Sequence, residues 1–445
     1  MIATIFRKPF GLLLLSAFLV GFGRGIQAAN FFVAPTGNDA NAGTQEKPFA
    51  SIQRAQDAVA AGDTVFIRGG TYVMVESQIA KKYRIWAYVT LLDKSGTQDK
   101  PIRYWAYEKE TPVFDFSRVK PELRVTAFFV TGSWIHLKGL EVIGVQVTLK
   151  GHTQSICFDN EGSHNIYERL SMHDGQAIGI YSIKGSDNLF LNCDAYRNHD
   201  YVSEDGRGGN TDGFGCHPPA GGTGNVFRGC RAWFNSDDGF DCINAHESVT
   251  FENCWAFYNG FSPTFKSLGD GNGFKAGGYG STAVDRLPKT IPRHTVRFCL
   301  AVRNKASGFY SNHHLGGSDW FNNTGYRNGA NFNMLCRLAD NHTDVPGHGH
   351  KLRNNLAFKG RSDLTQLDAA KSDAANNSFT MDLKVTDQDF LSLDEAQLIK
   401  PRQPNGDLPV ITLLHLADGS PLVGKGVDVG FPFHGPRPNL GAFEK

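Results

Sequence analysis

A tetrapeptide built around Gly-Phe recurs in the middle of the chain and carries charged residues in matching places. Its four copies are Asp212-Gly213-Phe214-Gly215, Asp238-Gly239-Phe240-Asp241, Asn272-Gly273-Phe274-Lys275 and Ser307-Gly308-Phe309-Tyr310. The Gly-Phe pairs are 26, 34 and 35 residues apart. If successive copies stack as the coils of a solenoid, Asp212 lies beside Asp238, and Asp241 lies beside Lys275, at the strand spacing of about 4.8 Å.

This stacking gathers the carboxylates of Asp212, Asp237, Asp238 and Asp241 into one patch. Like charges so close together repel one another, so the patch needs a neutralising partner. Carboxylates on loops suit Ca²⁺, which takes roughly six to eight oxygen ligands in flexible geometry, better than Mg²⁺, which demands a strict octahedron. The alternative is that each Asp only forms a turn beside a glycine. Four such residues in two adjacent coils, next to a lysine, favour the Ca²⁺ site.

Lys275 is the one charged residue in the stretch from Gly271 to Gly278, where small neighbours leave room for a ligand. A bound divalent cation nearby disfavours the ammonium form of a lysine and lowers its pKa, so that the neutral amine can act as a general base. A plain salt bridge between Lys275 and Asp241 is the alternative.

A second repeat predicts the elements that hold these residues in place. An Ala/Gly position recurs with gaps of 37, 24, 45, 24 and 32 residues, at Ala195, Ala232, Ala256, Ala301, Gly325 and Ala357. Each copy follows a short stretch of alternating apolar residues, which indicates a strand rather than a helix. The shortest gap suits three short strands and three turns, and longer gaps then contain loops inserted at one turn. We therefore expect an all-β fold, a right-handed parallel β-helix.

Two other residue types recur in the same register. Cysteines share one slot at Cys193, Cys230, Cys254 and Cys299, and asparagines share another at Asn198, Asn235, Asn259, Asn304 and Asn328. We interpret the cysteines as small apolar residues stacked inside, with disulfides as the alternative. The asparagines predict a ladder at a turn, where Asn tolerates the left-handed conformation. No C-x-x-C motif is present, so a zinc site is not expected.

The ends of the solenoid need covers, because an open end exposes strand edges and core. Residues 48–61 show amphipathic helical spacing and predict an N-terminal cap helix. The repeat fades after about residue 360. We expect one domain over residues 30–445, with a cap over about 30–70, coils over about 71–360, and an irregular C-terminal extension over about 361–445 that packs back along the coils.

The first 29 residues resemble a secretory signal peptide. Arg7 and Lys8 precede an apolar run from Phe10 to Phe22, and Ala28-Ala29 offers small residues for cleavage. A run this short does not span a bilayer, which takes about 20 residues, although an N-terminal anchor remains the alternative. The net charge of +1 gives no electrostatic basis for binding nucleic acid or an anionic membrane. We expect a secreted monomer, extracellular or periplasmic.

The acidic motif resembles that of polysaccharide lyase family 9, which contains pectate lyases with a right-handed β-helix fold. The resemblance rests on the segments Asn210–Phe214, Asn235–Asp241 and Gly271–Lys275. It implies that the four aspartates bind Ca²⁺ and that Lys275 is the catalytic base, and the chain shows no departure at these five positions. The implied reaction is β-elimination on a galacturonate-containing polymer of the plant cell wall, with activity rising towards alkaline pH.

Two pectic polymers are candidate substrates. Pectate is the first expectation, and the histidine-rich turn Asn312–Gly317 makes rhamnogalacturonan an alternative within the same family. Candidate substrate-binding residues on the coil after Lys275 are Arg303, Lys305, His313 and His314. Two other classes stay open: a β-helix glycoside hydrolase with Asp237 and Asp238 as acid and base, and a non-catalytic carbohydrate-binding solenoid.

Overall fold

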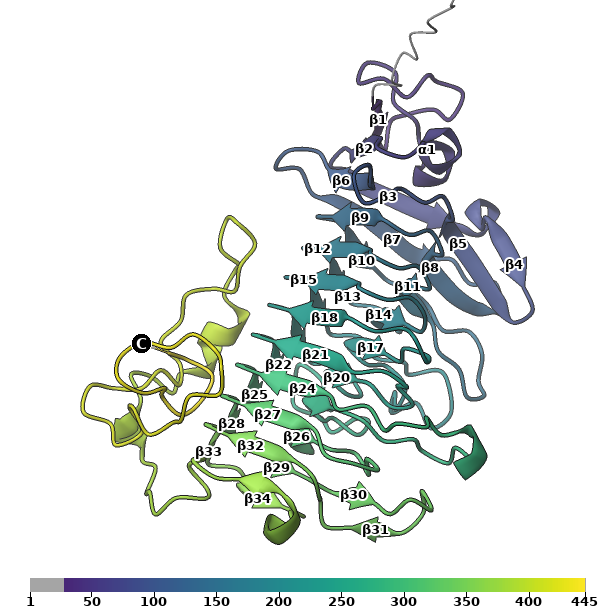
Figure 1. Ribbon diagram of the computed structural model, residues 1–445. Helices are drawn as coiled ribbons and strands as arrows, with labels where there is room; N and C mark the ends of the chain where they lie inside the picture. The colour runs from purple at the N-terminus through teal and green to yellow at the C-terminus, as the bar shows by residue number, and fades with distance from the viewer. Residues whose placement is uncertain (1–27, 445) are drawn as a thin grey trace, which may run out of the picture.

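The computed structural model describes residues 28–444, which form a parallel β-helix (Figure 1). Each coil contributes one strand to each of three long sheets, which we name sheets A, B and C. Neighbouring strands in these sheets run parallel, except that β4 is antiparallel to β5 at the edge of sheet C. The all-β solenoid predicted from the repeats is therefore confirmed.

The three sheets have 12, 10 and 11 strands. Sheet A contains β1 (Asn30–Val33), β2 (Thr64–Ile67), β6 (Ile102–Ala106), β9 (Ile135–Lys138), β12 (Ile166–Glu168), β15 (Leu189–Leu191), β18 (Asn225–Arg228), β21 (Val249–Glu252), β24 (Thr295–Arg297), β27 (Asp319–Phe321), β32 (Lys351–Arg353) and β35 (Asp373–Ala374). Sheet B contains β3 (Gly70–Val75), β7 (Pro112–Arg118), β10 (Glu141–Ile143), β13 (Ser171–His173), β16 (Asp194–Tyr196), β19 (Arg231–Trp233), β22 (Trp255–Phe257), β25 (Leu300–Val302), β28 (Thr324–Tyr326) and β33 (Leu356–Phe358).

Sheet C holds the Gly-Phe repeat. It contains β4 (Lys81–Tyr83), β5 (Trp86–Leu92), β8 (Arg124–Val130), β11 (Ile156–Asn160), β14 (Ile178–Ser182), β17 (Phe214–Cys216), β20 (Phe240–Asp241), β23 (Phe274–Lys275), β26 (Ser307–Tyr310), β29 (Ala330–Asn333) and β34 (Leu364–Thr365). The remaining elements are the hairpin β30 (Cys336–Arg337) and β31 (Asp344–Val345), helix α1 (Ile52–Ala58), and the 3₁₀ helices η1 (Glu76–Gln78), η2 (Val284–Arg286), η3 (Ala369–Lys371), η4 (Asp387–Asp389) and η5 (Glu395–Ile399).

Strand pairing reproduces both predicted registers. The Ala/Gly slot forms one continuous row across sheet B, in the order Ala195, Ala232, Ala256, Ala301, Gly325 and Ala357. In sheet C the rings of Phe214, Phe240, Phe274, Phe309 and Phe332 stack with centroids 4.8–5.2 Å apart. Residues one coil apart therefore lie side by side, as the repeat predicted.

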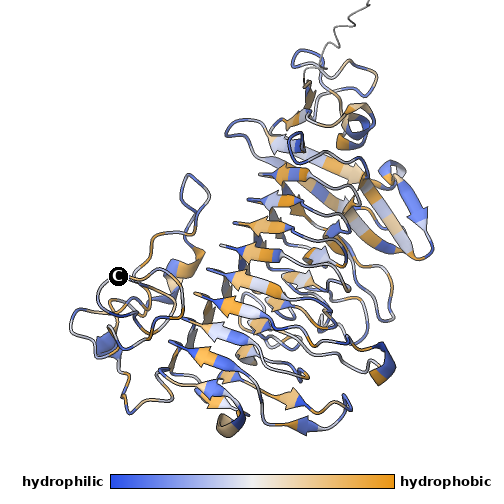
Figure 2. Cartoon of the chain, viewed as in Figure 1, coloured by the Kyte–Doolittle hydropathy of each residue, from blue (hydrophilic) through white to orange (hydrophobic). Residues whose placement is uncertain are grey.

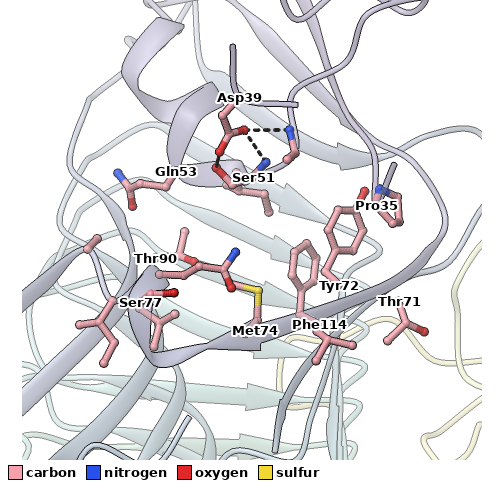
Figure 3. Close-up of a pocket in the computed structure, with 17 residues that line it drawn as sticks. Pro35, Asp39, Ser51, Gln53, Thr71, Tyr72, Met74, Ser77, Thr90 and Phe114 are labelled. Atoms are coloured by element: carbon pink, nitrogen blue, oxygen red, sulfur yellow. Dashed lines mark hydrogen bonds between the residues drawn. The ribbon is translucent and has the colours of Figure 1, made fainter. Parts of the chain in front are cut away.

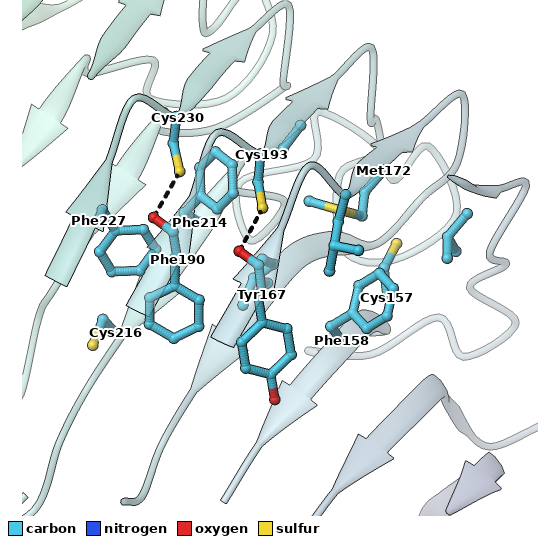
Figure 4. Close-up of a cluster of buried hydrophobic side chains, with 14 of the residues drawn as sticks. Cys157, Phe158, Tyr167, Met172, Phe190, Cys193, Phe214, Cys216, Phe227 and Cys230 are labelled. Atoms are coloured by element: carbon cyan, nitrogen blue, oxygen red, sulfur yellow. Dashed lines mark hydrogen bonds between the residues drawn. The ribbon is translucent and has the colours of Figure 1, made fainter. Parts of the chain in front are cut away.

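The interior is apolar and continuous from coil to coil, and the strands alternate between hydrophobic and hydrophilic residues (Figure 2). Figure 4 shows a part of it in which aromatic rings stack beside cysteines. The thiol of Cys193 donates to the carbonyl of Tyr167 at 3.2 Å, and that of Cys230 to the carbonyl of Phe190 at 3.3 Å. All eight cysteines are buried and free, which confirms the interior stack over the disulfide alternative.

The asparagine ladder is present, but its cause differs from the one predicted. Asn235 Nδ2 donates to Asn259 Oδ1 at 3.2 Å, and Asn259 Nδ2 donates to Asn304 Oδ1 at 3.0 Å. The left-handed residue is the one before each asparagine, such as Phe234 (φ 53°) and Tyr258 (φ 60°). Asparagine therefore occupies this slot because its buried amide bonds to its neighbours along the stack, not because it tolerates a positive φ.

The N-terminal end of the solenoid is covered, and the C-terminal segment packs along its side. At the start, α1 lies over the first coils, Ser51 caps its N-terminus by accepting from the N–H of Arg54, and Ile52 and Ala55 are buried. The predicted cap helix is thus confirmed, with seven residues. The C-terminal segment lies beside strands β22, β25 and β28 of sheet B (Figure 1). It contacts them through buried residues that include Leu398 and Leu413.

The predicted signal peptide lies outside the described residues, apart from Ala28 and Ala29. Within residues 28–444, no helix is both long enough and apolar enough to cross a membrane.

Candidate active site

Three consecutive strands of sheet C, β17, β20 and β23, bring the predicted residues together. Asp241 pairs directly with Lys275 in the strand register. Asp212 and Asp238 lie two residues before the stacked phenylalanines, in the turn that leads from sheet B into sheet C. The N–H of Asp238 donates to Asp212 Oδ1 at 3.1 Å, and the N–H of Asn272 donates to Asp238 Oδ1 at 2.6 Å. Asp212, Asp238 and Asn272 therefore occupy one slot on successive coils.

The carboxylates of Asp212, Asp238 and Asp241 each offer an oxygen within 4.8 Å of the other two, and all three residues are buried. The N–H of Ile243 fixes Asp241 Oδ1 at 2.7 Å. Lys275 Nζ lies 3.0 Å from Asp238 Oδ2 and 3.1 Å from Asp241 Oδ2. Each aspartate thus has one oxygen fixed by a backbone N–H, and the second oxygens of two of them face the lysine.

Asp237 lies at the edge of this cluster. Its Oδ1 accepts from the N–H of Asp270 at 2.9 Å, and it is not among the three carboxylates that converge. Its side chain is nevertheless buried and close enough for its charge to act on Lys275. The structure therefore brings four of the five predicted residues into direct contact and leaves Asp237 beside them.

The electrostatics of the cluster show an excess of buried negative charge. Burial raises the pKa of Asp212 and of Asp237 well above the usual range, and neighbouring carboxylates raise it further. Burial also raises the pKa of Asp238, although Lys275 opposes that shift. Burial by itself lowers the pKa of Lys275, but the carboxylates, led by Asp238 and Asp241, outweigh it and raise that pKa well above its ordinary value.

The donor set fits a hard divalent cation. All the converging ligand atoms are carboxylate oxygens, and no backbone N–H donates to the buried Asp238 Oδ2. Its ion pair with Lys275 is what compensates it. A cation held by Asp212, Asp238 and Asp241 would balance the negative charge that the ammonium of Lys275 balances in part.

Comparisons with known proteins identify the family of the chain. A family described as "Pel9A-like, right handed beta helix region" matches residues 31–355. The chain belongs to this Pel9A-like family. Its members here are polysaccharide lyases: pectate lyase L of Dickeya dadantii is 33% identical over 421 residues, covering 93% of this chain and 90% of the relative. Pectate lyase PEL9 of Emericella nidulans is 29% identical, covering 88% and 94%.

Solved structures place the chain in the same family. A structure titled rhamnogalacturonan lyase is 47% identical, with a TM-score of 0.85, and covers 88% of this chain and 97% of that one. The crystal structure of pectate lyase Pel9A is 31% identical, with a TM-score of 0.75, and covers 95% and 98%. A second family description, "Rhamnogalacturonan lyase-like, C-terminal", matches residues 368–430. The Pel9A-like chain is therefore a polysaccharide lyase with a right-handed β-helix.

Two tyrosines that the sequence analysis did not select flank the acidic cluster of this Pel9A-like lyase. Outward-facing positions on sheet C run in the order Tyr181, Gly215, Asp241, Lys275 and Tyr310. A Cβ at Gly215 would lie 2.6 Å from the Tyr181 ring. The glycine therefore leaves space on the outer face of sheet C between Tyr181 and Asp241. Tyr310 was identifiable in advance, because it fills the place of Asp241 and Lys275 in the fourth Gly-Phe copy.

The four predicted substrate-binding residues lie in different surroundings. Lys305 Nζ donates to the carbonyls of Leu268, at 2.8 Å, and Gly269, on the loop beside Asp237. Arg303 points towards Glu395 of η5, at 3.6 Å. These two residues lie on the turn that leads into β26, one coil past Lys275.

The two histidines differ from each other. His313 pairs with Asp344 at 2.8 Å and lines a pocket of about 450 Å³ with Arg337. His314 is fully buried: its Nδ1 accepts from the N–H of Gly278 at 3.0 Å, and its Nε2 lies 2.9 Å from the carbonyl of Pro292. The expectation that His314 borders the groove is therefore wrong. Burial lowers its pKa to about 4, so it is a neutral internal residue.

Two loops inserted at the same turn, residues 199–211 and 261–270, border the acidic cluster; they belong to the two coils that flank the coil of β19 and β20. They enclose a pocket of about 430 Å³ lined by Arg207, Asp270 and Lys305, among others. Arg207 was not selected from the sequence, because nothing in the repeat places a residue that lies inside an insertion.

A separate cavity of about 480 Å³ lies under the N-terminal cap, lined by Tyr72, Met74 and Phe114 among others (Figure 3). Asp39 on its rim already accepts from the hydroxyl and N–H of Ser51. Its lining contains no cluster of charged groups, and it belongs to the first coils rather than to the strands that carry Lys275.

Proposed function

We propose that this Pel9A-like lyase is a secreted, monomeric, Ca²⁺-dependent enzyme that cleaves a galacturonate-containing pectic backbone by β-elimination. The observation that carries the proposal is the position of Lys275. Its amine lies 3.0 and 3.1 Å from two carboxylates of a buried, oxygen-only cluster. A base next to a cation site is what proton abstraction beside a carboxylate requires.

Asp212, Asp238 and Asp241 hold the cation in this proposal, and Asp237 adds its charge from the edge. Ca²⁺, when bound, draws electron density from the C6 carboxylate of the sugar and so acidifies the proton on C5. Asp238 and Asp241 then share their negative charge with it and attract the ammonium of Lys275 less. Burial of Lys275, which lowers its pKa, now favours the neutral amine.

Neutral Lys275 Nζ takes the C5 proton, the bond between C4 and the glycosidic oxygen breaks, and a double bond forms between C4 and C5. The lone pair of Nζ accepts the proton, and the departing oxygen keeps the electrons of the broken bond until it is protonated. Since Lys275 must be neutral to act, turnover is expected to rise with pH through the pKa of this lysine in the loaded enzyme.

The backbone of rhamnogalacturonan is the substrate that the comparisons favour. The structure with 47% identity is titled rhamnogalacturonan lyase, and the C-terminal segment matches a rhamnogalacturonan lyase-like family. Polygalacturonate is the second candidate, because curated relatives at 33% identity are named pectate lyase. Both polymers carry the C6 carboxylate on which the proposed chemistry depends.

Two readings from other classes fit these residues less well. A glycoside hydrolase with Asp237 and Asp238 as acid and base gives no role to Lys275, and the two carboxylates follow each other in one turn rather than facing each other across a bond. A solenoid that only binds carbohydrate gives no reason to bury a lysine among three carboxylates.

The experiment that tests the proposal is ultraviolet absorbance during incubation with each polymer, with Ca²⁺ and with a chelator, for wild type and Lys275→Ala. A rise on one polymer that needs both Ca²⁺ and Lys275 supports the lyase and identifies its substrate. New reducing ends without absorbance would contradict β-elimination and favour the hydrolase. Intact polymers with measurable binding would favour the carbohydrate-binding solenoid.

A further inference from the structure

A cationic furrow follows the acidic cluster along the axis of the β-helix. It has a volume of about 540 Å³ and lies on the turns that lead from sheet B into β26, β29 and β34, one to three coils past Lys275. We define the furrow by the side chains of Phe261, Arg303, Lys305, Arg327 and Arg361. None of the described residues that line it is an aspartate or a glutamate.

The four cations of the furrow fall into two pairs. Arg303 and Arg327 both contact Glu395 of η5, at 3.6 and 2.9 Å, so they share one carboxylate of the C-terminal segment. Lys305 and Arg361 take part in none of the ion pairs found within residues 28–444. Neither Lys305 nor Arg361 is therefore in direct contact with a carboxylate of the described chain, although the charges of Asp270, Asp237 and Asp238 act on Lys305 from a distance.

The ammonium of Lys305 is held by two hydrogen bonds and keeps one donor free. Its ammonium donates to two backbone carbonyls, those of Leu268 and Gly269, and an ammonium has three donors. Burial lowers its pKa, and the charge of Arg207 lowers it further, while the nearby carboxylates, led by Asp270, oppose this shift. Lys305 and Arg207 are thus two cations held near one another, and such a pair favours an anion between them.

Arg361 is exposed and lies back over the preceding coil. A Cβ at Gly329 would be 2.9 Å from Arg361 Nη2, so the glycine makes room for the guanidinium above its own turn. That turn neighbours the one that carries Lys305, since the N–H of Ala330 donates to the carbonyl of Ala306. Arg361 therefore lies over the turn that neighbours the turn of Lys305.

The furrow is continuous with the active site. Lys305 also lines the pocket of about 430 Å³ between the inserted loops, together with Arg207 and Asp270. The N–H of Asp270 donates to Asp237 at 2.9 Å. A polymer bound at the acidic cluster can therefore pass along the turns and reach Lys305 and Arg361.

We propose that the furrow is a second anionic subsite, in which Lys305 and Arg361 bind a uronate carboxylate of the substrate several sugars from the bond that breaks. The inference rests on the proposed function for the identity of the polymer. It adds that the enzyme binds long acidic chains at a second place, away from the bond that breaks. A long polymer should therefore bind more tightly than a short oligomer.

Affinity electrophoresis through gels containing polygalacturonate or rhamnogalacturonan backbone, in chelator, tests this binding without turnover. The variants are Arg361→Gln and Lys305→Gln. Arg118→Gln on β7 is the matched control, since Arg118 is also exposed and lies in the first coils, away from the furrow. Thermal unfolding of each variant checks the fold, and fully methyl-esterified pectin serves as the neutral probe.

We expect Arg361→Gln to bind the acidic polymers about fivefold more weakly than wild type, the size of one exposed charge pair. Arg118→Gln should bind like wild type, added salt should weaken wild-type binding, and no variant should change binding to the esterified polymer. Equal retardation of the folded Arg361→Gln and Arg118→Gln variants would overturn the subsite, as would wild-type protein that binds no acidic polymer. Retained binding with no elimination would count against the proposed function alone.

Discussion

The asparagine ladder and the slot that holds Asp212 and Asp238 lie near each other on the same turns. Side chains of both slots bond from one coil to the next, but only the second slot carries charge. In the asparagine ladder, the side chains of Asn235, Asn259 and Asn304 bond to one another from coil to coil, and all are neutral. In the adjacent slot, Asp212 and Asp238 also accept backbone N–H groups from the next coil, as an asparagine would. Their second atom, however, is an oxygen with negative charge rather than an NH₂ group.

This difference shows how one position of a structural repeat can become a candidate metal site. An asparagine satisfies both its donor and its acceptor within the stack, so the ladder only stabilises the fold. An aspartate in an equivalent place leaves an unsatisfied buried oxygen and a charge, which costs stability unless a ligand compensates it. The next residue in the acidic slot, Asn272, is neutral again, and its Oδ1 accepts from the N–H of Ser307 at 3.1 Å. The chain therefore confines the unfavourable charge to the two coils that precede the coil of Lys275.

The largest effect is expected when the acidic slot is made to resemble the ladder. Asp238→Asn keeps the acceptor for the N–H of Asn272 but removes the charge that faces Lys275 and the cation. Activity should fall about 10³-fold, as when a preorganised electrostatic contact is lost, while thermal unfolding in chelator changes little. Steady-state rates on the preferred polymer measure this effect. Asp115→Asn on β7 is the matched exchange, and equal activities of the two variants would show that Asp238 has no catalytic role.

The reverse exchange places a charge in the ladder. Asn259→Asp removes the donor to the carbonyl of Ala232 and to Asn304 Oδ1, and buries a carboxylate with no cation nearby. The free energy of unfolding should fall by about 3–5 kcal/mol. Because burial raises the pKa of the new carboxyl group, the folded state gains a proton at low pH, and the loss should shrink as the pH falls. Denaturant unfolding at two pH values measures the loss of stability. A variant as stable as wild type would contradict the claim that a charge is costly in the ladder.

Removal of the metal should make stability depend on pH. The raised pKa values of Asp212, Asp237 and Asp238 mean that these groups bind more protons in the folded state than in the unfolded state. Their protonation therefore supports the fold fully below the unfolded pKa of about 3.9, and this support is lost as the pH rises through the folded values. Melting temperatures in chelator should decline over that range.

Ca²⁺ should remove most of this decline by binding the folded state, with a gain of about 2.7 kcal/mol when its concentration is 100 times the Kd. Melting curves with Ca²⁺ and with chelator, recorded in parallel at each pH, provide the comparison. Identical curves at all pH values would mean that the carboxylates do not hold the cation.

The smallest effect is expected at Asp212. Asp212→Asn preserves the acceptor for the N–H of Asp238 and removes one of the repelling charges, so the chelated protein should be about 1 kcal/mol more stable than wild type. The same variant should lose the stabilisation by Ca²⁺. Chemical denaturation in chelator checks the first point, and a clear loss of stability there would contradict the account of repulsion in the slot.

The sequence was sufficient for features that depend on the repeat. The row from Ala195 to Ala357 and the pairing of Asp241 with Lys275 follow from equal positions in successive copies, because each coil pairs in register with the next. It was not sufficient where side-chain direction departs from alternation. His313 and His314 are a case: Asn312 and His313 both have positive φ, at 54° and 55°, so the inward direction of His314 does not follow from its place in the copy.

Contacts between distant segments were also beyond the sequence. Arg303 contacts Glu395, 92 residues away, and no spacing relates the C-terminal segment to the coils. Arg207 lies inside an inserted loop, and Arg361 reaches its position because Gly329 on the preceding coil has no side chain. These contacts are fixed by tertiary packing rather than by the repeat. The acidic cluster was therefore predictable, while of the furrow beside it only Arg303 and Lys305 were selected from the sequence.

The central claim is that the charged slot exists to hold a cation beside Lys275. Calorimetric titration of Ca²⁺ into chelator-treated, dialysed protein tests it most directly, with wild type and Asp238→Asn compared under the same conditions. We predict one binding site in wild type and none in Asp238→Asn, although both remain folded. Equal binding by the two proteins, or no binding by wild type, would contradict the claim.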